Sequence, residues 1–180
     1  MSGSLFYDAP KLDQIAINLF YGWGYNFYRL ENQLRADDLM IREKAGFLLG
    51  QSRAMLEAEQ SAYRRTHLPA PSRAQPLPPP EAVEAARALE DLSISIGTLE
   101  GTIRALPVPE TDRMTQRYRQ EAPTLAALAA CDQRLIGLAG ALRDTLDGRD
   151  HAWMLAHRAE IQDAIGLLQR QVRDRQSLLK

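Results

Sequence analysis

Apolar side chains that recur in alternating steps of three and four residues most strongly constrain how this chain folds. In the clearest stretch they are Leu89, Leu92, Ile96, Leu99, Ile103 and Leu106. This spacing places them on one face of an α-helix, as a seam that packs against another helix. Similar seams run through residues 41–63, 128–142 and 154–172, and no stretch shows the sustained alternation of a strand. The pattern predicts an all-α fold, a bundle of about five helices.

A proline-rich segment divides the chain. Six of the ten prolines lie in residues 64–80, where each removes a helical N–H donor and restricts φ. We therefore expect an aromatic-rich helical segment over residues 1–63, a crossover linker over 64–80 and a helical bundle over 81–180. The two helical parts should pack as one domain. The linker also carries a basic-PxxP arrangement, but such a match arises easily where prolines are dense.

Capping signals in the N-terminal half leave the number of helices open. Asp37 or Asp38 could cap a second helix, and two helices in close succession are our preferred interpretation. One long helix through residues 10–63 is the alternative, because the apolar seam continues across the two aspartates. After the linker, Pro80 suits the first turn of a helix, where its missing N–H would have no partner in any case.

Turn signals in the C-terminal half predict a helical hairpin. Asp147 and Gly148 are typical of a tight turn. The stretch from about residue 150 to 179 has one continuous helical seam, which includes His157. We therefore expect this last helix to fold back along the preceding one as an antiparallel pair.

Two pairs of glycines occur within predicted helices. Gly46 and Gly50 are four residues apart, as are Gly97 and Gly101. Glycine in a helix costs about 1 kcal/mol relative to alanine, so each pair indicates a flat face that something approaches closely. A neighbouring helix is the preferred explanation, and a ligand is the alternative.

The aromatic residues are concentrated near the N-terminus. Eight of the twelve lie in residues 6–28, and six of these fall on the apolar stretch Phe20, Tyr21, Trp23, Tyr25, Phe27 and Tyr28. A helix that is aromatic on most sides is either buried on several sides or an interface. Three interpretations are open: a core helix of the bundle, a protein–protein interface, or a pocket for a planar or cationic ligand.

The chain lacks the common constellations of catalytic and metal-binding residues. It contains no nucleotide-binding glycine loop and no GxSxG or HExxH motif. His151 and His157 are six residues apart, which is wrong for two ligands on one helix face. Cys131 lies on an apolar seam, where a buried thiol is expected. The sequence therefore predicts no catalytic residues, no metal and no cofactor.

Composition narrows the class of protein further. The net charge is −1, with 22 basic and 23 acidic side chains, which argues against nucleic-acid binding. A single cysteine cannot form an internal disulfide, and the N-terminus does not resemble a signal peptide. No apolar run is long enough to span a membrane. We expect a cytoplasmic protein.

Together these features favour a non-enzymatic protein-binding module: an adaptor, an assembly factor or a subunit of a complex. Its recognition surface would be the aromatic helix, with Glu31 beside it, and its partner another protein or a second copy of itself. The alternative is a helical enzyme, or a carrier of a cofactor or small ligand, with an aromatic-lined pocket around Trp23.

Overall fold

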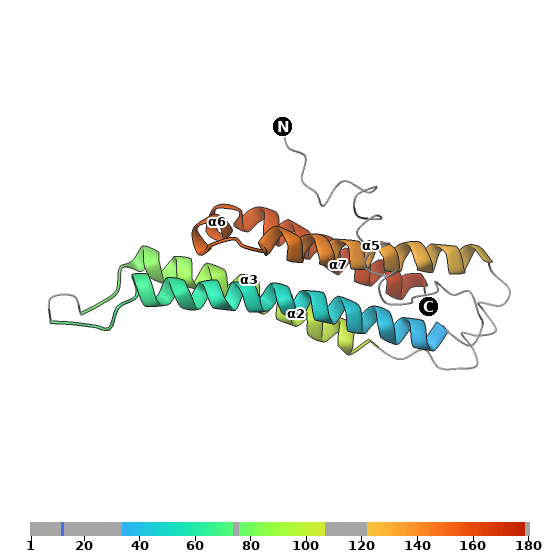
Figure 1. Cartoon of the computed structure of the whole chain (residues 1–180), viewed down its shortest axis with the longest axis horizontal. Coiled ribbons are helices and arrows are strands. Elements are labelled where there is room, and N and C mark those ends of the chain that lie inside the picture. The colour runs from blue at the N-terminus through green and yellow to red at the C-terminus, as the bar shows by residue number, and fades with distance from the viewer. Residues whose placement is uncertain (1–11, 13–33, 74–75, 107–121, 179–180) are drawn as a thin grey trace, which may run out of the picture.

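The computed structural model describes residue 12 and residues 34–73, 76–106 and 122–178 of the chain. Labelled as in Figure 1, its helices are α2 (Leu34–His67), α3 (Pro80–Arg104), α5 (Ala122–Leu146), α6 (His151–Ala156) and α7 (Arg158–Leu178). The five helices pack together, and the described residues contain no strand. This confirms the all-α fold. Of these helices, none has both the length and the apolar composition needed to cross a membrane.

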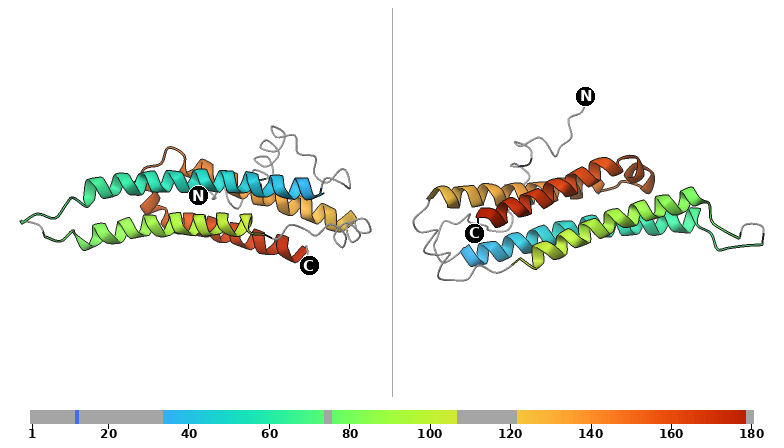
Figure 2. Two further views of the ribbon diagram at one scale, coloured as in Figure 1. Left: turned by 90° about the horizontal axis from the view of Figure 1, so that it is seen from below. Right: turned by 180° about the vertical axis from the view of Figure 1, so that it is seen from behind.

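The four long helices form two layers. α2 and α3 run side by side in opposite directions in one layer, and α5 and α7 do the same in the other (Figures 1 and 2). Between the layers, α2 lies against α5 and α3 lies against α7. The short helix α6 contacts α2, α3 and α7 at one end of the bundle. At the same end, the described parts of the linker, residues 68–73 and 76–79, extend beyond α2 and α3 (Figure 1).

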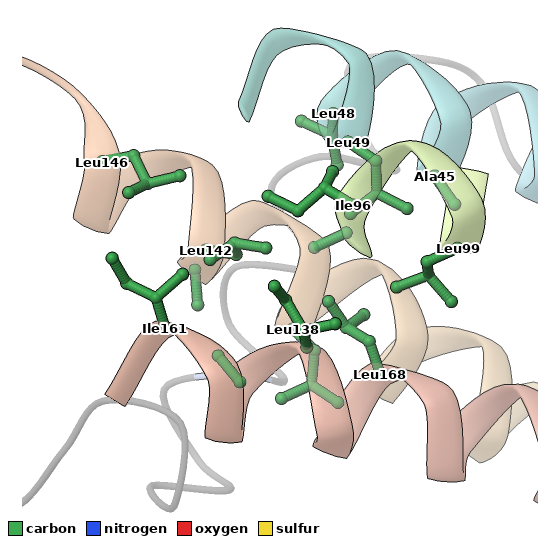
Figure 3. Packing of buried hydrophobic residues seen from close by; sticks show 14 of the residues in the cluster. Ala45, Leu48, Leu49, Ile96, Leu99, Leu138, Leu142, Leu146, Ile161 and Leu168 are labelled. Atoms are coloured by element: carbon green, nitrogen blue, oxygen red, sulfur yellow. The ribbon is translucent and has the colours of Figure 1, made fainter. Parts of the chain in front are cut away.

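The predicted seams meet in one hydrophobic core. Side chains from α2, α3, α5 and α7 interdigitate there, among them Leu48, Ile96, Leu142 and Leu168 (Figure 3). Leu89, Leu92, Ile96 and Leu142 are fully buried. Burying one such side chain contributes about 1.5–3 kcal/mol. The heptad-like spacing of residues 89–106 is thus explained by contact with three neighbouring helices, α2, α6 and α7.

The helix α2 is continuous where a break was the preferred expectation. It runs from Leu34 through Asp37 and Asp38, so neither aspartate caps a second helix. It also continues to His67, four residues into the stretch assigned to the linker. The first proline after Tyr63 is Pro69, and until that point nothing in the backbone prevents helical hydrogen bonding. On the far side of the linker, α3 begins at Pro80, as the sequence predicts.

The last helix is divided in two, contrary to the expectation of one helix over residues 150–179. His157 separates α6 from α7 with φ −105° and ψ 20°. Its Nδ1 lies 2.9 Å from the carbonyl oxygen of Trp153, and its ring stacks on the Trp153 indole at 4.0 Å. The backbone N–H of His157 bonds the same carbonyl at 3.0 Å, and the Ile161 N–H bonds the His157 carbonyl at 3.1 Å, so helical hydrogen bonds continue across the junction. His157 is therefore half-buried at a helix junction and not in the core.

The paired glycines accommodate charged side chains between α2 and α3. A Cβ on Gly46 would lie 3.2 Å from Nε of Arg104, and one on Gly97 would lie 3.4 Å from the Arg53 side chain. Each arginine is held by an ion pair within its own helix, Arg53 with Glu57 and Arg104 with Glu100, both at 2.7 Å. The glycines thus make room for arginine side chains that lie along the interface, and not for a neighbouring backbone.

A different glycine marks the close backbone contact. In α5, all eight residues from 135 to 142 are buried. A helix at the edge of a bundle exposes one face to solvent, and by helical spacing that face of α5 would include Gly137 and Ala141. Leu12 covers this face: its carbonyl oxygen lies 2.5 Å from the position of a Cβ on Gly137, and its side chain is 2% exposed. Leu12 therefore packs against the outside of α5.

The substitution Gly137→Ala tests this contact. A methyl group there would overlap the Leu12 backbone, so we expect the free energy of unfolding to fall by about 1–3 kcal/mol in urea titrations. The control is Gly166→Ala in α7, where a Cβ would meet only the end of the Arg170 side chain at 3.8 Å. That substitution should stabilise the helix by up to about 1 kcal/mol. Equal effects of the two substitutions would contradict the role given to Leu12.

Candidate functional site

The residues predicted to form the recognition surface are Phe20, Tyr21, Trp23, Tyr25, Phe27, Tyr28 and Glu31, and all seven lie outside the described residues. The described residues nearest to them in sequence are Leu12 and Leu34. Leu12 is buried against α5, and Leu34 is the first residue of α2. The aromatic stretch therefore lies between two points of the chain that belong to the bundle.

The first half of α2 exposes two large apolar side chains. Leu39 and Phe47 are each 49% exposed. They are eight residues apart, a spacing that puts them on the same side of the helix. The Nζ atom of Lys44 lies 5.7 Å from the centre of the Phe47 ring, within the range of a cation–π contact. Burial, and to a smaller extent the positive charge of Arg143, lower the pKa of Lys44.

A cluster of rings joins α2 to α6 at the far end of the bundle. The ring of Tyr63 stacks on His67 at 4.4 Å and meets the edge of His151 at 5.3 Å, and the two imidazoles are 5.8 Å apart. Glu59 completes the junction: its Oε2 accepts a hydrogen bond from the backbone N–H of His151 at 2.9 Å and lies 3.2 Å from Nδ1 of the same residue. A carboxylate at the first turn of α6 satisfies a helical N–H that has no partner within that helix.

Next to this ring cluster lies an open cleft of about 320 Å³. Met55 and Leu146 provide apolar surface, while Glu59, Arg149 and Asp150 contribute charges of both signs. All three charged groups already have partners within the protein. Glu59 contacts His151 as described above, Asp150 accepts a hydrogen bond from the backbone N–H of Trp153 at 2.8 Å, and Arg149 lies over the Trp153 ring at 4.8 Å. The residues of the cleft and of the ring cluster are thus engaged in contacts within the protein, and these contacts connect α2 to α6.

Buried polar groups link α5 to α7. Nε of Arg175 lies 2.6 Å from Oδ1 of Asp132, and these side chains are 2% and 0% exposed. One turn away, the Gln171 amide donates hydrogen bonds to the carbonyl oxygen and the Sγ of Cys131, at 3.2 and 2.9 Å. Burial raises the pKa of the Cys131 thiol, with a smaller opposing effect of the Gln171 hydrogen bond. The thiol is thus kept in its unreactive protonated form, as its position on the seam predicted.

Neither sequence motifs nor helical periodicity predicts the ring cluster between α2 and α6 or the buried polar contacts between α5 and α7. His67 and His151 are 84 residues apart in the chain, and Asp132 and Arg175 are 43 apart. Each pair forms only because one helix end or face meets another. The sequence signal that was available is weak: Asp132 and Arg175 are adjacent to seam positions, where a charged residue needs a partner.

The described residues contain no group of three or more His, Cys, Asp or Glu side chains that could bind a metal ion. Comparison of the chain with protein-family models, with curated proteins and with solved structures finds no match.

The ion pair between α5 and α7 leads to a stability prediction. Asp132→Ala would leave the Arg175 guanidinium buried without this carboxylate, so we expect the free energy of unfolding to fall by about 3–5 kcal/mol in urea titrations. The matched control is Asp144→Ala on the same helix, which removes the 3.0 Å pair with Arg143. Asp144 is half-exposed, and an exposed pair contributes about 1 kcal/mol or less. A small effect of Asp132→Ala would contradict the structural role of the buried pair.

Proposed function

We propose that this protein is a non-enzymatic helical protein-binding module, acting as an adaptor, an assembly factor or a subunit of a complex. The aromatic segment that contains Trp23 would be its recognition surface. The observation that carries the proposal is the half-exposed pair Leu39 and Phe47 on one side of α2. Leu39 and Phe47 follow the aromatic stretch in the chain, so they would extend its recognition surface onto α2.

The composition of this region supports a protein partner. Phe, Tyr and Trp are enriched at the centres of protein interfaces, where they bury a large area with few rotatable bonds. The cation–π contact of Lys44 also restricts the Phe47 ring, which reduces the entropy lost when a partner covers it.

The attachment of the N-terminal segment supports the same proposal. Leu12 is buried against Gly137 and Leu34 opens α2, so the chain between them is held to the bundle at both ends. A recognition segment tethered in this way loses less entropy on binding than a free tail. A cytoplasmic location is part of the proposal, and the free, buried Cys131 thiol is compatible with a reducing compartment.

Site-specific photo-crosslinking tests the proposal. A benzophenone amino acid in place of Phe47 should form a discrete adduct with another protein in the native host, identified by peptide mass spectrometry. The same group in place of Arg173, which is exposed on α7, is the control and should not form that adduct. Adding Trp23→Ala to the Phe47 variant should reduce the adduct at least tenfold, since interface tryptophans often contribute 2 kcal/mol or more.

Two results would count against the protein-binding proposal. One is an equal pattern of adducts from positions 47 and 173, which would indicate random collision. The other is a small molecule that native mass spectrometry finds bound to the purified chain and that Trp23→Ala removes. The second result would favour the alternative, an enzyme or carrier with an aromatic-lined pocket.

A further inference from the structure

We draw no further inference here: the strongest candidate, the exposed linker between α2 and α3 with the side chains of Arg73 and Leu77, carries none, because nothing in the structure shows what would cover it.

Discussion

The enclosure of α5 is the constraint on which the rest of this structure depends. Over residues 135–142 the helix is buried on every side, with α2 and α7 against two of its faces and Leu12 over a third. A helix this apolar is stable only when all of its surroundings are protein. The apolar seams of α2 and α7 cover two sides of α5. On the third side Gly137 has no side chain, so the backbone of Leu12 can approach more closely than it could to a larger residue. The contact of Leu12 with Gly137 is therefore part of this enclosure.

Polar contacts then select one register among those the apolar seams allow. Leucine-rich seams can slide past one another by a helical turn at modest cost, but a buried charge separated from its partner is expensive. The contact of Arg175 with Asp132 sets α7 against α5 near one end of the bundle. At the other end, the bonds from Glu59 to His151 set α6 against α2.

The expectations from the sequence succeeded and failed for identifiable reasons. Seam residues such as Leu89, Ile96 and Leu142 are buried as predicted, because helical periodicity directly reports which side of a helix faces the core. The helix start at Pro80 was also predictable, since it depends on the chemistry of one residue. The interruption at His157 was not, because no local signal such as a proline or a glycine marks it. The predicted aromatic site lies outside the described residues and stays a prediction.

By itself, the sequence determined the class of fold and the side of each long helix that is buried. Both follow from local spacing, which acts within a few turns of one helix. The tertiary structure decided which helices are neighbours, that Arg104 covers Gly46 and Arg53 covers Gly97, and that the backbone of Leu12 contacts Gly137. It also brought His67 to His151 and Asp132 to Arg175. The physical reason is that these contacts join residues distant in the chain, so their energy depends on how the packed helices are placed and not on any local pattern.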